Sequence, residues 1–283
     1  MTRKDKPKVA LIYDFDGTLS PGNMQEFGFI KAIKKTQKNF WAESNKMAKD
    51  NDADSILCYM FQMIKNADFN ELPKTKESFK NFGEKVELFK GVEEWFKLIN
   101  NYGKTKDLTI KHYIISSGLK EMIDGTSIAK EFEYIYASSY IYDANGVVIW
   151  PGVAVNFTTK TQFLFKINKG IREISDNFKI NEYVPEPQRD VPFERMIYFG
   201  DGQTDIPCMK MVKVHGGHSI ALYDNKNKKT EAMKLIKEDR VNFVCKADYS
   251  EGKELHKVVT TIIDKIKADF DFSTLLEKHH NNI

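Results

Sequence analysis

Residues 9–20 read VALIYDFDGTLS, and this stretch decides how the rest of the chain is interpreted. Residues 8–13, a short apolar run bounded by polar residues, have the pattern of a buried β-strand. The run ends abruptly in two carboxylates, Asp14 and Asp16, followed by Gly17. Two acids this close together repel each other unless a positive group lies between them. The stretch therefore predicts a strand that brings two acids to a site where a cation is also present.

The composition of the chain limits the classes of protein to consider. The 283 residues are 41% hydrophobic, which is enough for a substantial core in one large domain or two. The 43 basic and 40 acidic residues nearly balance and are interleaved, so we expect no nucleic-acid partner. No apolar run approaches the length of a membrane span, and the run after the charged N-terminus is too short for a signal peptide. We therefore expect no membrane association.

The three cysteines, Cys58, Cys208 and Cys245, are odd in number and widely spaced. They form no Cys-x-x-Cys ligand pair, and we interpret them as reduced thiols. We expect their main role to be that of small buried apolar residues. Such cysteine usage is typical of a cytosolic protein, so we expect a cytoplasmic location.

Residues 21–88 differ in character from the segments on either side. Apolar residues recur there at helical spacing, first from Met24 to Ile33 and again from Ile56 to Ala67, with polar clusters between them. No strand pattern interrupts them. We interpret 21–88 as an inserted helical cap domain, and residues 1–20 with 89–283 as a discontinuous core domain.

From residue 89 onward, strand and helix patterns alternate. Helices are expected at 91–100, 160–169 and 253–267, and a hairpin is expected around Asn145-Gly146. Further strands are expected at 109–115, 134–137, 195–199, 219–223 and 243–245. This alternation predicts an α/β fold with a Rossmann-like, doubly wound and mostly parallel sheet. The hairpin is either a surface elaboration or an oligomer contact, and the oligomeric state stays open.

Three predicted strands end in short polar loops: DFDGT at 14–18, SSG at 116–118 and GDGQTD at 200–205. In open parallel sheets, ligands bind just beyond the carboxyl ends of the strands. Asp14, Asp16 and Asp201 are therefore expected to converge. A Mg²⁺ ion would relieve their repulsion, because it is a hard cation that prefers oxygen ligands.

These motifs, together with a lysine that opens the helix at residue 160, resemble in their order those of the haloacid dehalogenase superfamily of Mg²⁺-dependent phosphohydrolases. The resemblance covers most of the chain, although 21–88 matches only as a generic helical cap. The position of this insert, between the first motif and the SSG strand, resembles the phosphoserine-phosphatase-like branch. DFDGT alone is moderately specific, whereas all four motifs in the right order are a strong signal.

The resemblance implies a role for each matching acid. Asp14 would be the nucleophile that forms an aspartyl-phosphate. Asp16 would be the general acid and then the general base, and its backbone carbonyl would meet Mg²⁺. Asp201 would be a direct ligand, so that Asp14, Asp16 and Asp201 form the metal set. Asp205 would support them through water or an orienting hydrogen bond.

The resemblance also implies two phosphate-binding groups. Ser116 would donate a hydrogen bond to a phosphoryl oxygen, although Ser117 competes for this role. Lys160 would stabilise the charge that develops in the transition state, with Lys166 and Lys169 as alternatives. The residues expected to shape the loops around the site are Gly17, Thr18, Ser117 and Gly118.

Taken together, the sequence predicts a Mg²⁺-dependent phosphatase that hydrolyses a small phosphorylated metabolite. The second acid and the metal site favour a phosphate ester over a carbon–halogen substrate. Phosphoserine is one candidate, but the insert carries no recognisable substrate signature; Met24, Phe27 and Phe29 either line the pocket or form the core of the insert. The alternatives are phosphoryl transfer to an acceptor other than water and a non-hydrolytic sensor of phosphorylated ligands.

Overall fold

The computed structural model describes residues 6–176 and 178–280, in which seven strands form one sheet. Their order is β4-β3-β2-β1-β5-β6-β7, and all neighbours are parallel except the antiparallel pair β3–β4. The strands are β1 (Lys8–Tyr13), β2 (Thr109–Leu119), β3 (Tyr134–Tyr142), β4 (Val148–Val153), β5 (Met196–Gly200), β6 (His218–Tyr223) and β7 (Phe243–Lys246). The predicted α/β fold with a mostly parallel sheet is confirmed.

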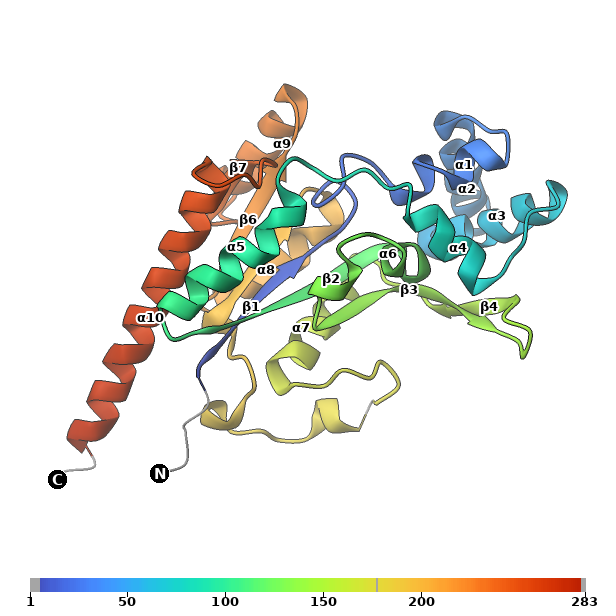
Figure 1. Cartoon of the computed structure of the whole chain (residues 1–283). Helices are drawn as coiled ribbons and strands as arrows, with labels where there is room; N and C mark the ends of the chain where they lie inside the picture. The colour runs from blue at the N-terminus through green and yellow to red at the C-terminus, as the bar shows by residue number, and fades with distance from the viewer. Residues whose placement is uncertain (1–5, 177, 281–283) are drawn as a thin grey trace.

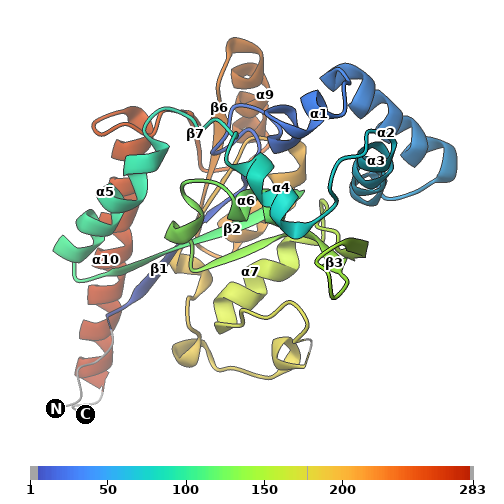
Figure 2. The ribbon, with the colours of Figure 1, turned by 45° about the vertical axis from the view of Figure 1, so that its right-hand side comes forward.

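Helices cover both faces of this sheet, as Figures 1 and 2 show. One face carries α5 (Val92–Thr105) and α10 (Glu254–His280). The other carries α7 (Lys160–Lys169), α8 (Ile206–Val214) and α9 (Lys226–Lys237). Short 3₁₀ turns lie in the connections at Ala129–Glu131, Lys179–Asn181, Glu186–Gln188, Phe193–Arg195 and Gln203–Asp205.

The central strand β1 is buried on both faces, which explains its continuous apolar sequence. Val9 and Leu11 pack into the core beneath α5 and α10, whereas Ala10 and Ile12 pack toward α7 and α8. All four side chains are inaccessible to solvent. Each large aliphatic side chain buried in this way contributes about 1.5–3 kcal/mol to folding. This burial fixes the end of β1, and with it the position of the acids that follow.

The segment 21–88, called the helical insert below, contains helices and no strand of the sheet. Thr36, Asp54 and Thr75 cap its three longer helices, because each side chain accepts hydrogen bonds from amides of the first turn. Its helices are the 3₁₀ turn η1 (Met24–Glu26), α1 (Phe29–Ala32), α2 (Gln37–Asn51), α3 (Ser55–Phe69) and α4 (Lys76–Gly83).

The β3–β4 hairpin and the short helix α6 (Lys120–Asp124) connect the helical insert to the sheet (Figure 1). The amide of Val148 donates to the Lys74 carbonyl over 2.9 Å, and the amide of Lys76 donates to the Gly146 carbonyl over 3.1 Å. The Tyr140 hydroxyl donates to the Met60 carbonyl over 2.7 Å. The hairpin is thus bound to the insert by backbone hydrogen bonds.

Four predicted boundaries were wrong. Helix α5 continues to Thr105 instead of ending at Asn100. Strand β2 continues to Leu119 instead of ending at Ile115, because a register shift lets it keep pairing with β3 beyond Ser116. The segment 134–142 is a single strand whose later half pairs with β4. Helix α10 reaches His280 instead of ending near 267, and ion pairs one turn apart, such as Lys267 with Asp271, support this extension.

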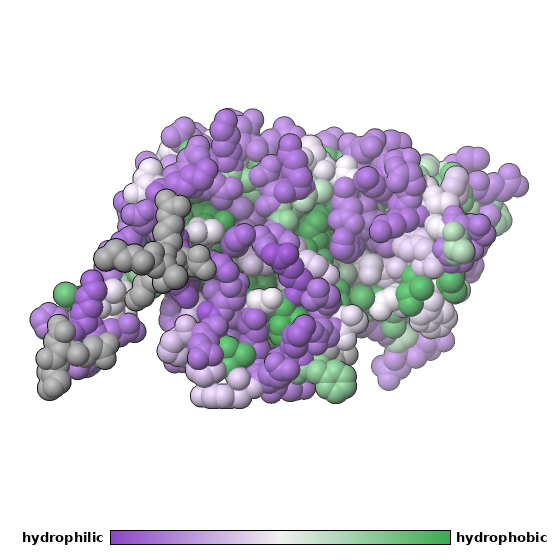
Figure 3. Space-filling model, turned by 60° about the horizontal axis from the view of Figure 1, so that its bottom comes forward, coloured by the Kyte–Doolittle hydropathy of each residue, from purple (hydrophilic) through white to green (hydrophobic). Residues whose placement is uncertain are grey.

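Polar side chains dominate the face seen in Figure 3, where apolar residues form small separate groups. Within the described part of the chain, no helix combines the length and the apolar character that a membrane crossing needs. Cys58, Cys208 and Cys245 are all buried and unpaired.

Candidate active site

The loop after β1 places the first two acids beside the end of β5. The amide of Asp14 donates to the Phe199 carbonyl over 2.9 Å, which holds the two strand ends together. Gly17 has a φ of +74°, and a Cβ atom there would lie 2.1 Å from Asp201 Oδ2. Only glycine combines this backbone conformation with such a close approach. The glycine of DFDGT therefore allows Asp201 to lie against the loop that carries Asp14 and Asp16.

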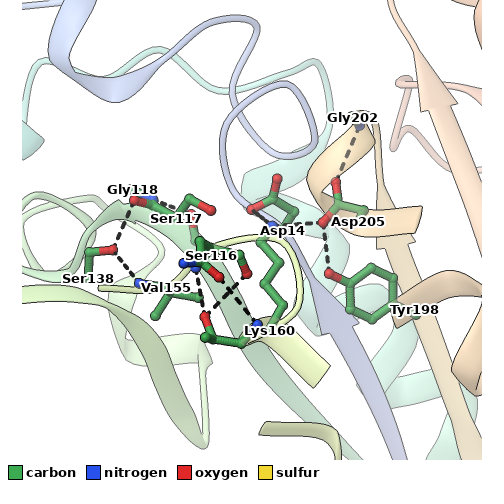
Figure 4. A network of polar contacts seen from close by, with 12 residues as sticks. Asp14, Ser116, Ser117, Gly118, Ser138, Val155, Lys160, Tyr198, Gly202 and Asp205 are labelled. Atoms are coloured by element: carbon green, nitrogen blue, oxygen red, sulfur yellow. Dashed lines mark hydrogen bonds and ion pairs between the residues drawn. The ribbon is translucent and has the colours of Figure 1, made fainter. Parts of the chain in front are cut away.

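Lys160 lies between two carboxylates at the base of this site (Figure 4). Its Nζ atom is 3.0 Å from Asp14 Oδ1 and 2.7 Å from Asp205 Oδ1, and its side chain is fully buried. The Tyr198 hydroxyl also donates to Asp205 Oδ1 over 2.8 Å, and the Gly202 amide donates to Asp205 Oδ2 over 3.3 Å. Asp205 is thus held by protein donors on both oxygens and orients the lysine toward Asp14.

Burial and mutual repulsion alter the proton affinities of these groups. Burial, then the charge of Asp205, raises the pKa of Asp14 to about 7, although Lys160 opposes this shift. Burial alone would lower the pKa of Lys160, but the carboxylates of Asp14 and Asp205 outweigh it and raise that pKa. Lys160 therefore stays charged, and Asp14 is ionised near neutral pH only at a cost that a further cation would remove.

Asp16 lies where the helical insert begins. Its Oδ1 atom accepts a hydrogen bond from the Met24 amide over 2.9 Å. Burial, followed by the charge of Asp14, raises the pKa of Asp16 well above its ordinary value, while the Met24 hydrogen bond acts in the opposite direction. A carboxyl group whose pKa is raised in this way keeps its proton to a higher pH than a solvent-exposed one and can give it up to a basic oxygen nearby.

Asp201 carries its own counter-charge. Lys228, in the first turn of α9, places its Nζ atom 2.8 Å from Asp201 Oδ2. Burial raises the pKa of Asp201, although Lys228 opposes this shift. Lys228 was not predicted from the sequence, because it belongs to a lysine-rich stretch (226–229) that resembles an ordinary solvated surface. Only the fold brings one of those lysines to the site.

The two serines of SSG occupy the end of β2. The Ser116 hydroxyl accepts a hydrogen bond from the Gly118 amide over 3.0 Å, so its own proton remains available. The Ser117 hydroxyl oxygen is buried and has no hydrogen-bond partner in the part of the chain that the structure describes, whereas the Ser117 carbonyl accepts from the hydroxyls of Tyr59 and Ser138. Both serines border the same cavity, so geometry alone leaves the choice between them open.

A cavity of about 320 Å³ lies between the ends of the strands and the helical insert. Its floor is formed by core residues, and its opposite wall is formed by the insert. The floor residues are Asp14, Asp16, Gly17, Ser116, Ser117, Gly118, Asp201, Thr204 and Lys228. The wall residues are Gly22, Asn23, Gln25, Trp41, Ile56 and Tyr59.

The carboxylates at the floor fit a hard divalent cation. One oxygen from each of Asp14, Asp201 and Asp205 lies within 4.8 Å of the others. Carboxylate oxygens are the ligands that Mg²⁺ prefers. Four buried or half-buried acids face only two lysines here, which leaves an excess of negative charge; the six residues are Asp14, Asp16, Asp201, Asp205, Lys160 and Lys228.

Several predicted or alternative residues lie elsewhere. Lys166 donates to the backbone carbonyls of the segment 173–176, and Lys169 donates to those of Ile180 and Glu182, so both point away from the cavity. Thr18 is buried behind the loop, where its carbonyl accepts from the Tyr249 hydroxyl. None of Met24, Phe27 and Phe29 borders the cavity. Met24 and Phe29 are buried in the apolar core that the insert shares with one face of the sheet, where Met24 Sδ accepts from the Leu119 amide.

Sequence reasoning missed Tyr198 and the whole wall of the cavity. Strand alternation could have found Tyr198, because it shares a face of β5 with Gly200 next to the GDGQTD loop. The wall residues Gln25, Trp41 and Tyr59 carry no such signal. Helical periodicity identifies buried positions, but it does not tell which of them face a cavity.

Comparison with known proteins gives the family. Residues 11–210 match the haloacid dehalogenase-like hydrolases. An uncharacterised protein of Borreliella burgdorferi is 30% identical over 277 residues, which cover 88% of this chain and 94% of that protein.

Solved structures share the fold at low sequence identity. A phosphoserine phosphohydrolase-like protein from Francisella tularensis is 18% identical, with a TM-score of 0.51, over 84% of this chain and 94% of its own. A substrate-bound phosphoserine phosphatase is 16% identical, with a TM-score of 0.54, over 90% and 99%. A hydrolase of the family from Salmonella enterica serovar Typhi is 16% identical, with a TM-score of 0.55, over 90% and 72%. The chain thus belongs to the haloacid dehalogenase-like hydrolases and shares its fold with phosphoserine phosphatases.

Proposed function

We propose that this protein is a Mg²⁺-dependent phosphatase that hydrolyses the monoester of a small phosphorylated metabolite through an aspartyl-phosphate on Asp14. The observation that carries the proposal is the set of groups around the Asp14 carboxylate. A buried lysine is 3.0 Å from it, and Ser116 and the acid Asp16 border the same cavity. A nucleophile, a proton donor and phosphate-binding groups thus lie close together at the floor of the cavity.

In the first step, an Asp14 carboxylate oxygen attacks phosphorus and the bond from phosphorus to the ester oxygen breaks. The electron pair of that bond goes to the leaving oxygen, which takes the proton of Asp16 and departs as an alcohol. In the second step, Asp16 accepts a proton from water while the water oxygen attacks phosphorus. The bond from phosphorus to the Asp14 oxygen breaks, its electron pair restores the Asp14 carboxylate, and inorganic phosphate leaves.

Lys160 and Ser116 would bind the phosphoryl oxygens that gain charge during both steps. The Ser116 proton is free because its oxygen already accepts from the Gly118 amide. Lys160 is held in place by Asp205, which the Tyr198 hydroxyl fixes in turn. Such a preformed arrangement needs little reorganisation during the reaction.

The site would hold Mg²⁺ through Asp14, Asp201 and the backbone carbonyl of Asp16. The ion would neutralise the phosphoryl group and the acids around it. We also propose that the helical insert (21–88) acts as a cap domain on the core (1–20 and 89–283), because it supplies the wall opposite the floor. The buried, unpaired cysteines favour action in the reducing cytosol.

The direct test is phosphate release from p-nitrophenyl phosphate, measured with and without Mg²⁺ for the wild-type protein and for Asp14→Asn. We expect metal-dependent turnover that falls by at least about 10³-fold in the variant. Asp50→Asn, on the exposed face of the insert, is the matched control and should retain activity. If the protein binds phosphorylated ligands but does not hydrolyse them, the sensor alternative is favoured. If it transfers phosphate to added glycerol, the phosphotransferase alternative is favoured.

A further inference from the structure

The wall of the cavity contains a buried amide whose oxygen has no hydrogen-bond partner among the described residues. Gln25, in the 3₁₀ turn at the start of the insert, is only 1% exposed. Its Oε1 atom is buried, and no residue in 6–176 or 178–280 forms a hydrogen bond with it. Buried polar atoms are almost always paired, because an unpaired one loses its interactions with water without compensation. An acceptor of this kind, in the wall of a ligand-sized cavity, indicates that a ligand supplies the missing donor.

A second buried glutamine in the insert shows what a structural role looks like. Gln62, in α3, is 6% exposed, and its Oε1 atom accepts a hydrogen bond from Asn66 Nδ2 over 3.2 Å. Its side chain does not border the cavity. Gln62 is therefore satisfied within the protein, whereas the Oε1 atom of Gln25 is not.

Among the described residues, those that the insert contributes to the wall carry no charge; they are Gly22, Asn23, Gln25, Trp41, Ile56 and Tyr59. Glu26, which follows Gln25 in the sequence, is not among the residues that line the cavity, and its Oε1 atom accepts hydrogen bonds from Trp41 Nε1 over 2.8 Å and from Asn23 Nδ2 over 2.7 Å. The cation on the cavity surface, Lys228, lies on the floor and pairs with Asp201.

The wall also presents ring surfaces. Trp41 and Tyr59 pack edge to face with ring centroids 5.9 Å apart, and Ile56 lies beside them in the wall. The polar atoms of both rings are already used, because Trp41 Nε1 binds Glu26 and the Tyr59 hydroxyl binds the Ser117 carbonyl. These residues therefore offer apolar contact and leave polar recognition to the amides of Asn23 and Gln25.

We propose that the group esterified to phosphate is uncharged and hydroxylated, so that the substrate is a phosphorylated polyol or sugar. One of its hydroxyls donates to Gln25 Oε1, and its carbon skeleton packs against Trp41, Tyr59 and Ile56. The inference rests on the proposed phosphatase activity and adds the class of substrate. Gln25 is then a specificity-determining residue.

A charged leaving group fits this wall poorly. A carboxylate would meet no cation of the insert, and the neutral amide of Gln25 cannot compensate its charge, so that charge would be buried without a counter-charge. An ammonium group would be buried against Trp41, Ile56 and Tyr59. The acids that border the cavity lie on the floor, beside the phosphoryl group, and Glu26 of the insert already binds Trp41 and Asn23. A hydroxyl is small and neutral, and it can donate the hydrogen bond that Gln25 Oε1 lacks.

The first experiment compares two substrates that differ at one carbon. Glycerol 3-phosphate ends in a hydroxymethyl group where 3-phosphoglycerate ends in a carboxylate. We expect kcat/KM to be at least about tenfold higher for glycerol 3-phosphate, and higher also than for phosphoserine and phosphoethanolamine. Equal values, or a preference for any of the charged esters, would overturn the inference.

The second experiment removes the amide. Gln25→Leu keeps the size of the side chain but cannot accept a hydrogen bond, and we expect it to lower the ratio of kcat/KM for glycerol 3-phosphate over 3-phosphoglycerate at least about fivefold. Gln62→Leu is the matched control and should leave this ratio unchanged. Gln25→Lys supplies a cation instead, and it should shift the preference toward 3-phosphoglycerate. If neither Gln25 variant moves the ratio, Gln25 does not recognise the leaving group.

p-Nitrophenyl phosphate separates the two proposals. If the wild-type protein hydrolyses it in an Asp14-dependent manner but prefers charged natural esters, the phosphatase assignment stands and the substrate class is wrong. If no phosphate ester is hydrolysed, the proposed function itself fails.

Discussion

The two sides of the cavity are built in opposite ways. The floor comes from the ends of the core strands and is dense in charge, with Asp14 and Asp205 sharing the ammonium group of Lys160. The wall comes from helices of the insert, is neutral, and leaves the Gln25 carbonyl oxygen unpaired. The floor is therefore suited to the chemistry of a phosphoryl group, and the wall is suited to selecting what the phosphoryl group is attached to. Substitutions in the floor should lower kcat/KM for all phosphate esters, whereas substitutions in the wall should change kcat/KM only for esters whose leaving group contacts the wall.

The largest effect should come from the proton donor of the floor. Asp16→Asn should lower the rate of the first turnover by about 10²–10⁴-fold for an alkyl phosphate, because the leaving alkoxide then receives no proton. The loss should be much smaller for p-nitrophenyl phosphate, whose leaving group departs without protonation. The measurement is the first-turnover burst of leaving group in rapid mixing. An equal loss for both esters would contradict the assignment of Asp16 as general acid.

Next comes the buried lysine. Lys160→Met should reduce kcat/KM by about 10²–10³-fold for every substrate, because the transferring group then loses the cation that is held beside Asp14. It should also lower the free energy of unfolding by about 3–5 kcal/mol, since Asp14 and Asp205 are left buried without their cation. Lys166→Met, in the same helix but bonded to carbonyls away from the floor, should retain kcat/KM. Similar kinetics for the two variants would show that Lys160 is only structural.

The acids of the floor should make the metal-free protein less stable as pH rises. Burial, with the charge of Asp205, raises the pKa of Asp14 to about 7. The folded chain therefore binds this proton more tightly than the unfolded chain does. The resulting stabilisation is complete below about pH 4 and is lost as pH rises to about 7.

Denaturant titrations of the metal-free protein can measure this effect. Asp14→Asn should be more stable than the wild type at pH 8, by about 1–4 kcal/mol, and the difference should shrink toward zero at pH 4. Saturating Mg²⁺ should reduce the advantage of the variant at pH 8, because the ion compensates the wild-type carboxylates. A difference that is constant with pH would contradict this account of the floor.

The smallest effect should come from the wall. Trp41→Leu should lower kcat/KM for a hydroxylated ester by about 3–10-fold through loss of ring contact, and Trp41→Phe should recover part of this loss. For methyl phosphate, which is too short to reach the ring, we expect a change of less than about twofold. Steady-state kinetics with both esters checks this. An equal loss for both esters would show that Trp41 affects every substrate, as a floor residue does, and does not select the leaving group.

The sequence predicted the floor much better than the wall, for a physical reason. Asp14, Asp16 and Asp201 follow strand ends, and parallel strands deliver such residues to one edge of a sheet. Lys160 was placed at the first position of a helix that indeed begins there and ends before Gly170. Local signals therefore fixed both the fold and most of the floor.

The rest depended on contacts between segments far apart in the chain. Lys228 reaches the floor only because α9 begins beside Asp201, and nothing separates it in sequence from its lysine neighbours. Trp41 and Tyr59 face the cavity because of the angle at which the insert lies on the core, which helical periodicity does not encode. The extension of β2 beyond Ile115 likewise depended on its pairing with β3.

A crystal structure of the protein with Mg²⁺ and beryllofluoride, a mimic of the phosphoryl group, tests the central claim most directly. The account predicts beryllium bound to a carboxylate oxygen of Asp14, with Lys160 and a serine of the SSG loop on its fluorines. It also predicts Mg²⁺ bound by Asp14 and Asp201, with the Gln25 amide facing the open space left for the leaving group. Beryllofluoride bound elsewhere, with the Asp14 carboxylate free, would contradict the account.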